Sequence, residues 1–250
     1  MDPLGAARVH LEAEATRLAY DARNRILADA DFTTRLAFML APQTAERLAA
    51  LIDPKRALAE VAPLTEAVHR DTINLSVVDR DRMAVSLIYS IFHGFGAGHA
   101  SSKYGILFQN RGAGFSLVPG HPNEAGGGKR PMHTIIPGML GTGGHITMPF
   151  GVMGGQYQPT GHARLITNLL TYGMDAQSAI DAPRCFTNAT GLKLERGYDA
   201  KVAAGLAALG HKVETSAEPL GGAQAIVIDP ENGVLQGASD PRKDGIALGY

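Results

Sequence analysis

Residues 71–79 read DTINLSVVD, and they carry the pattern on which the fold of this chain depends. From Ile73 onward, apolar side chains alternate with polar ones, which indicates a strand with one apolar face. A charged turn at 79–82 leads into a second apolar run at 84–89. Two such runs around a polar turn predict a β-hairpin. Thr72 therefore stands at the start of the first strand of this hairpin.

Thr72 gains interest from a glycine pair much later in the chain, Gly154-Gly155. Adjacent glycine amides in a tight turn can hold the oxyanion of an acyl transfer while a hydroxyl attacks the carbonyl carbon. A threonine hydroxyl needs a base beside it. Cleavage of the chain before Thr72 would supply its own α-amine, whose unperturbed pKa is about 7.7–8.0. Composition alone favours the simpler interpretation, in which Thr72 is a structural residue before a strand.

The rest of the chain combines helical and strand patterns. Apolar residues recur at helical spacing through residues 5–28, which predicts an amphipathic helix. Further helices are expected at 43–50, 160–172 and 199–209, and further strands at 104–109, 133–140, 146–152, 192–196, 223–229 and 234–238. Runs of strands followed by helices predict a layered α+β fold.

Composition excludes several classes of protein. The chain has 250 residues with 23 Lys and Arg against 24 Asp and Glu, so its balanced charge gives no reason to expect a nucleic-acid partner or a membrane surface. Its single cysteine, Cys185, cannot form an intrachain disulfide and fits a reducing compartment. We find neither an apolar stretch of membrane-spanning length nor a signal-peptide pattern. A cytoplasmic location is expected if the chain is complete.

Five blocks of sequence resemble a known family. They read DTINLSVVDRDRMAVSLIYSIFHGFGAG (71–98), GILFQNRGAGFS (105–116), GKRPMHTIIPGM (128–139), GVMGGQYQPTGHARLITNLLTYGMDAQSAIDAPR (151–184) and GASDPR (237–242). In order and spacing they are similar to the small, catalytic subunit of the γ-glutamyltranspeptidase family, a family of N-terminal-nucleophile hydrolases. Residues 1–71 resemble the end of the family's large subunit more loosely. The resemblance divides the chain into a large-subunit-like region and connector, 1–71, and a catalytic region, 72–250.

The resemblance implies a four-layer αββα sandwich. In this family the large subunit contributes to the sandwich, and most of that subunit has no counterpart here. We therefore expect the sandwich to be incomplete in this chain, with apolar surface left on the strand that starts at Thr72. The absent large-subunit chain is one expected partner.

The resemblance also assigns the catalytic residues. Thr72 matches the family's threonine nucleophile, which becomes a new N-terminus after self-cleavage, here between Asp71 and Thr72. Ser90 matches a second hydroxyl that orients the nucleophile, and the less favoured alternative is a polar strand residue. Gly154 and Gly155 match the glycine pair whose amides hold the oxyanion.

The substrate-binding positions depart from the family pattern. Asn110 lies in the segment that reaches the substrate, and His133 and Thr134 stand where the family has two serines that contact its carboxylate. Gly114 replaces an aspartate that holds the α-amino group in glutamyl-specific members, and Phe92 replaces a substrate-contacting asparagine. The loss of one charge-assisted hydrogen bond is worth roughly 1.5–3 kcal/mol. Specificity for γ-glutamyl substrates is therefore in question.

Three functions remain open at this point. The first is a γ-glutamyltransferase or glutathione hydrolase-like enzyme that acts on small-molecule amides. The second is an amidohydrolase or acylase of the same family that acts on small non-glutamyl amides. The third is a truncated, non-catalytic fragment. We expect no cofactor and no catalytic metal, because the nine histidines show no ligand spacing such as H-E-x-x-H.

Overall fold

The computed structural model describes residues 1–59 and 71–249. It divides into two compact units, each gathered from three stretches of chain. Unit 1 comprises Met1–Glu66, Asn110–His133 and Cys185–Ser216, and unit 2 comprises Ala67–Gln109, Thr134–Arg184 and Ala217–Tyr250. These units are the parts of the chain that pack together. The division into 1–71 and 72–250 instead follows the expected cleavage before Thr72, and it stays a prediction.

Unit 2 contains an antiparallel hairpin and a four-stranded antiparallel sheet. The hairpin consists of β1 (Asp71–Val78) and β2 (Ala84–Phe92). The sheet has the order β3-β4-β8-β9, with β3 (Pro137–Thr142), β4 (His145–Met153), β8 (Gly222–Asp229) and β9 (Val234–Ser239). The hairpin packs against β4 and β8.

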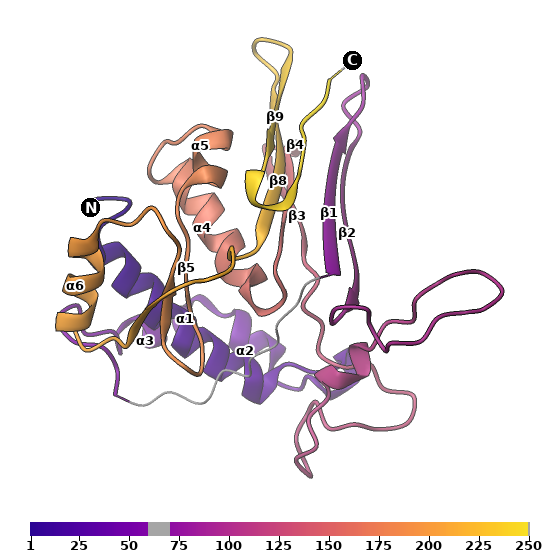
Figure 1. Cartoon of the computed structure of the whole chain (residues 1–250), viewed down its shortest axis with the longest axis horizontal. Coiled ribbons are helices and arrows are strands. Elements are labelled where there is room, and N and C mark those ends of the chain that lie inside the picture. The colour runs from indigo at the N-terminus through magenta and orange to yellow at the C-terminus, as the bar shows by residue number, and fades with distance from the viewer. Residues whose placement is uncertain (60–70, 250) are drawn as a thin grey trace. The chain divides into compact units, whose positions relative to one another are not determined.

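Two helices complete this unit. Helix α4 (Gln158–Leu170) contacts β4, and α5 (Ala176–Asp181) contacts β8 and β9. Figure 1 shows these helices on one side of the four-stranded sheet and the β1–β2 hairpin on the other. The described part of unit 2 thus has three layers, helices, sheet and hairpin. Two short 3₁₀ helices, η3 (Gly155–Tyr157) and η4 (Pro241–Lys243), lie in the connections.

The two faces of the hairpin carry different side chains. The outward face is apolar and 41–61% exposed at Ile73, Leu75, Val77, Val85, Leu87 and Tyr89. The face toward the sheet is largely polar. Asn74 lies on Gly151 of β4, where an added Cβ would fall 2.1 Å from Asn74 Nδ2. Ser86 Oγ donates a 2.6 Å hydrogen bond to the carbonyl of Phe150. A glycine at 151 therefore lets the two sheets approach closely.

Unit 1 is built around helix α1 (Ala6–Ile26). It packs with α6 (Ala200–Ala208) and with a three-stranded sheet of β5 (Cys185–Thr187), β6 (Leu192–Leu194) and β7 (Val213–Thr215). Their apolar side chains form one buried cluster of Val9, Ala13, Cys185, Leu192, Leu194, Val202 and Leu206. The remaining elements are η1 (Ala30–Phe32), α2 (Leu36–Leu40), α3 (Pro42–Ala49) and η2 (Arg111–Gly114).

The predicted α+β class is confirmed, and the predicted elements lie near their expected positions with one clear error. The expected strand at 104–109 is wrong. Gly105 has φ +65° and its amide donates to the carbonyl of Ser101, so this segment turns and forms only an isolated bridge between Ala100 and Leu107. Within the described ranges, none of the helices has the length and apolar character needed to cross a membrane.

Candidate active site

The hydroxyls of Thr72 and Ser90 meet at one end of the hairpin. The two residues are paired across β1 and β2, and both side chains are half-buried on the face toward the sheet. Thr72 Oγ1 donates a 2.8 Å hydrogen bond to Ser90 Oγ, which also accepts a 3.0 Å bond from the amide of Phe92. Ser90 is thus held by the backbone and in turn fixes the direction of the threonine hydroxyl.

A β-bulge lies at the peptide bond between Asp71 and Thr72. Asp71 pairs with Phe92, whereas Thr72 pairs with Ser90, so Ile91 is the extra residue of β2. Phe92 has φ +80°, a left-handed conformation that is uncommon for a bulky residue. Its ring is 4% exposed and stacks on His93 with 4.6 Å between ring centroids. Bulges recur next to active sites, where they redirect a side chain.

The glycine pair forms a tight turn at the end of β4. Gly154 has φ +127° and Gly155 has φ +57°, and a Cβ added to Gly154 would lie 2.8 Å from Gly221 Cα. The amide of Tyr157 closes the turn on the carbonyl of Gly154 at 3.0 Å. In the described part of the chain, neither Gly154 N nor Gly155 N donates a hydrogen bond to the protein. These amides are suited to bind an anionic oxygen.

The predicted substrate-binding residues divide between the units. Thr134 belongs to unit 2 and is 5% exposed. In unit 1, Asn110 precedes η2 and Gly114 is its last residue, whose carbonyl accepts a 2.7 Å bond from Asn123 Nδ2. His133 also belongs to unit 1, and burial, followed by the nearby charge of Arg111, lowers the pKa of its imidazole. His133 is therefore neutral near pH 7.

Sequence reasoning gave no role to His162, on α4. Its Nε2 accepts a 3.3 Å bond from the amide of Val152 in β4, and its ring lies 4.9 Å from that of Phe150. Burial lowers the pKa of His162 to about 4, against a smaller opposite effect of a bond to the Ile136 backbone. A neutral His162 thus fastens α4 to the strand that leads into the glycine turn. A lone histidine in a helical pattern carries no signal for this role.

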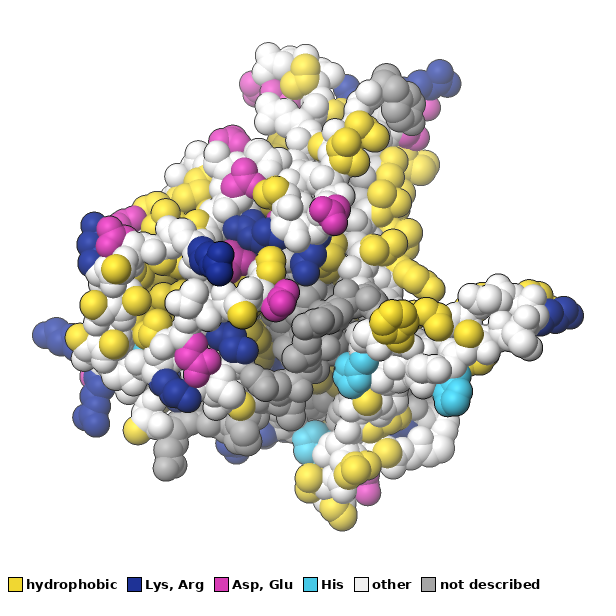
Figure 2. Space-filling model, viewed as in Figure 1, with side chains coloured by type: hydrophobic (Ala, Val, Ile, Leu, Met, Phe, Trp, Pro, Cys, Tyr) yellow, Lys and Arg dark blue, Asp and Glu magenta, His cyan; other side chains and the backbone are white. Residues whose placement is uncertain are grey.

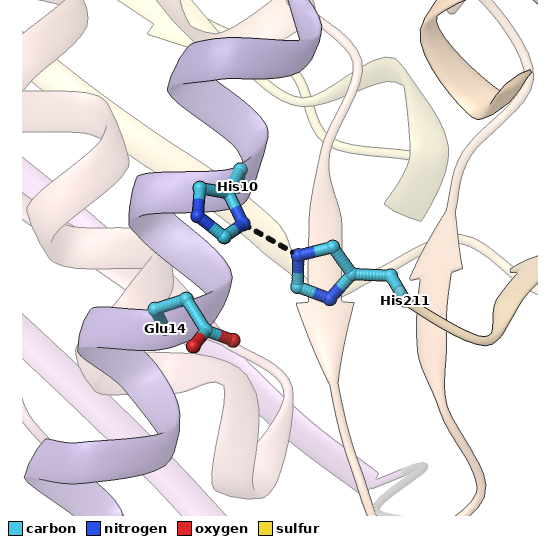
Figure 3. A group of neighbouring side chains, drawn as sticks. All are labelled: His10, Glu14 and His211. Carbon is cyan, nitrogen blue, oxygen red and sulfur yellow. Dashed lines mark hydrogen bonds between the residues drawn. The ribbon is translucent and has the colours of Figure 1, made fainter. Parts of the chain in front are cut away.

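One cluster in unit 1 has the composition of a metal site. Figure 3 shows His10 and Glu14 on α1 facing His211. His10 Nδ1 and His211 Nε2 lie 2.7 Å apart, and His10 Nε2 lies 2.8 Å from the carbonyl of Asp53. A carbonyl only accepts, so His10 donates through Nε2, and the Nδ1 of the neutral ring accepts a hydrogen bond from His211 Nε2–H.

The cluster is already satisfied without an ion. Glu14 accepts bonds from Arg17 at 3.0 Å and from the amide of Leu58 at 2.8 Å. Burial, ahead of the nearby charges, lowers the pKa of His211, which favours the neutral donor. A bound metal would have to replace the hydrogen bond between the two imidazoles. The expectation of no catalytic metal stays a prediction.

Comparison with solved structures identifies the fold class. A cephalosporin acylase from Bacillus halodurans has a TM-score of 0.79 and 29% identity, and it covers 100% of this chain and 51% of the acylase chain. A gamma-glutamyltranspeptidase from Pseudomonas nitroreducens has a TM-score of 0.65 and 26% identity, over 71% of this chain and 98% of that chain. The fold is therefore that of the N-terminal-nucleophile hydrolases.

A family model described as Gamma-glutamyltranspeptidase matches residues 1–250, and the chain belongs to this family. Among curated relatives, the oxamate amidohydrolase proenzyme of Klebsiella pneumoniae is 38% identical over 98% of this chain and 48% of its own length. The chain spans about half the length of the curated relatives it matches. The resemblance seen in the sequence is confirmed.

Proposed function

We propose that residues 72–250 form the catalytic part of an N-terminal-threonine amide hydrolase or acyltransferase, activated by cleavage between Asp71 and Thr72. The observation that carries this proposal is the 2.8 Å hydrogen bond between Thr72 Oγ1 and Ser90 Oγ. The Klebsiella relative is named a proenzyme. The match to the Pseudomonas enzyme uses 71% of this chain to cover 98% of a separate chain, and residues 72–250 make up about that share.

The proposed chemistry uses one hydroxyl twice. In the first step, Thr72 Oγ1 attacks the carbonyl carbon of Asp71, the peptide C–N bond breaks, and water hydrolyses the resulting ester. The freed α-amine then serves as the base for the same hydroxyl. In the second step, Thr72 Oγ1 attacks a substrate amide, the amine leaves with a proton, and water or another amine takes the acyl group. The amides of Gly154 and Gly155 stabilise the oxyanion in each attack on the substrate carbonyl and its ester.

The substrate class we favour is a small acyl amide without a glutamyl head. Gly114 offers no carboxylate for an α-amino group, and Phe92 is buried and apolar. The names of the oxamate amidohydrolase and the cephalosporin acylase point in the same direction. A comparison of kcat/KM for a γ-glutamyl anilide and its des-amino analogue tests this choice. A preference above about 100-fold for the glutamyl compound, about 2.7 kcal/mol, would favour a glutathione hydrolase-like enzyme.

The partner that we propose is the large-subunit portion of the relatives, which has no counterpart in this sequence. Figure 2 shows hydrophobic side chains gathered over the β1–β2 hairpin, where the outward residues are 41–61% exposed. Soluble monomers rarely leave a contiguous apolar patch of this kind uncovered. A helical layer supplied by the absent large-subunit portion would cover the hairpin and complete a four-layer αββα sandwich.

Intact mass after expression tests the proposed activation. We expect fragments 1–71 and 72–250 from the wild-type chain when it is co-expressed with a chain that supplies the absent portion, and an unbroken chain from Thr72→Ala. An unbroken wild-type chain in the presence of that portion would favour the non-catalytic alternative.

A further inference from the structure

A fully buried carboxylate holds the segment of chain that contacts the glycine turn, and it takes no part in the proposed chemistry. Asp240 is 0% exposed, and its side chain accepts hydrogen bonds from the Arg184 guanidinium and, at 2.8 Å, from the amide of Ala223. The other carboxylate oxygen accepts from the Arg242 amide at 3.0 Å and from its Nη1 at 3.3 Å. A buried charge is retained only where it is paired and fully hydrogen-bonded.

These bonds hold the start of β8 from two sides. Asp240 binds the Ala223 amide, and its partner Arg184 donates a 2.9 Å bond to the carbonyl of Leu220. Arg184 also donates to the carbonyl of Ile180 at 3.1 Å, which anchors the pair to α5. Residues 220–223 are thereby fixed at both ends by one ion pair.

The glycine turn rests directly on that segment. A Cβ added to Gly221 would lie 2.4 Å from the carbonyl oxygen of Met153, and one added to Gly154 would lie 2.8 Å from Gly221 Cα. Met153 and Gly222 are also paired in the β4–β8 ladder. The two backbones are in contact with no side chain between them, so a displacement of 220–223 is passed on to the turn.

We infer that Asp240, together with Arg184, is a positioning residue that sets the direction of the Gly154 and Gly155 amides. The inference rests on the proposed function only in the use of those amides as oxyanion donors. Asp240 does not contact the reacting atoms. It acts through the backbone of 220–223, and a misplaced oxyanion donor lowers the turnover number rather than the affinity for substrate.

The first test needs no enzyme activity. In a Thr72→Ala background, we compare Asp240→Asn with Asp229→Asn, which alters a half-buried aspartate at the other end of β8 that binds the Glu231 and Asn232 amides. The readout is hydrogen exchange at the Tyr157 amide, which closes the glycine turn on Gly154, with the β1–β2 hairpin as internal reference. We expect exchange at Tyr157 to rise at least about tenfold in Asp240→Asn only.

Asparagine is the sharper substitution because, in either orientation, its NH2 group would face donors that now bind a carboxylate oxygen, those of Ala223 and Arg184 or those of Arg242. Asp240→Ala instead removes the acceptor without adding a donor. Arg184→Lys keeps the charge but loses the fork that reaches both Asp240 and Leu220, so it should give an intermediate increase. If Asp240→Asn does not fold, Arg184→Lys supplies the same readout. An unchanged Tyr157 amide in the folded variants would overturn the inference.

The second test uses the cleaved, assembled enzyme. We expect Asp240→Asn to lower kcat about 100-fold while KM stays within about threefold, because losing one oxyanion donor costs 10²–10³ in kcat. A raised KM with an unchanged kcat would contradict the inference. If exchange at Tyr157 rises but the wild-type chain never cleaves, the positioning by Asp240 stands and the proposed function fails.

Discussion

The β1–β2 hairpin carries polar side chains on its packed face and apolar side chains on its outward face, which is the reverse of most sheets. The face packed on the four-stranded sheet presents Thr72, Asn74, Ser76, Ser86 and Ser90, whereas the outward face is entirely apolar. A sheet surface normally buries its apolar side. In the function we propose, the inner face carries the reacting hydroxyls and the outer face receives a further layer.

The largest effect is expected on the inner face at Thr72. Thr72→Ala should abolish self-cleavage and hydrolysis, a loss of more than about 10³-fold, because one hydroxyl serves both steps. Ser76→Ala, a neighbour on the same face, is the matched control and should retain both. Intact mass and an amide-hydrolysis assay measure the two steps. Cleavage in Thr72→Ala would remove the mechanism altogether.

The second effect concerns the close contact between the hairpin and β4. Gly151→Ala should lower the free energy of unfolding by about 1–3 kcal/mol, because its Cβ would meet the Asn74 amide 2.1 Å away. Asn74→Ala opens that space, so the double variant should lose less than the sum of the single changes. Denaturant unfolding of all three proteins gives the coupling energy. Strict additivity would show that the inner faces do not touch here.

The third effect lies in the turn that joins β1 to β2. Arg82 has φ +68°, which costs a non-glycine residue about 1–2 kcal/mol. Arg82→Gly should therefore raise the free energy of unfolding by about 1 kcal/mol. The gain is reduced by the loss of the 2.6 Å hydrogen bond that the Arg82 guanidinium donates to the carbonyl of Gly233. Met83→Gly, at the next position, should give no gain. Equal results for both glycines would place the strain elsewhere.

The smallest effect on stability is expected on the outward face. Leu87→Lys, at a side chain 52% exposed, should change the free energy of unfolding by no more than about 0.5 kcal/mol. The same change should make the isolated chain more soluble and weaken its binding to an added large-subunit chain. Size-exclusion chromatography and an apolar dye measure both. A loss of several kcal/mol would mean that this face is already packed.

The sequence predicted the hairpin well because alternation has a period of two, which is also the period of a strand. Alternation alone would have placed Ile73 and Leu75 in the core, and only the family resemblance predicted that they lie exposed. The strand expected at 104–109 is absent because Gly105 turns the chain, a local effect that outweighs the apolar run.

Contacts between residues far apart in the chain could not be predicted from the sequence. The contact of Asp240 with Arg184 joins positions 56 residues apart, and nothing local marks either as the partner of the other. The bulge at Asp71 is likewise set by the opposing strand rather than by the residues beside it. By contrast, the family resemblance predicted the hydroxyl pair of Thr72 and Ser90, because it matched Ser90 to the hydroxyl that orients the nucleophile.

The bulge between Asp71 and Thr72 gives the two sides of the proposed cut separate partners in β2. Asp71 is matched to Phe92 on one side of the bulge and Thr72 to Ser90 on the other, so each side has its own partner before the bond breaks. On departing, Asp71 would give up its pair with Phe92. The new amino terminus would keep its place without a conformational search, and the left-handed Phe92 could relax, releasing about 1–3 kcal/mol.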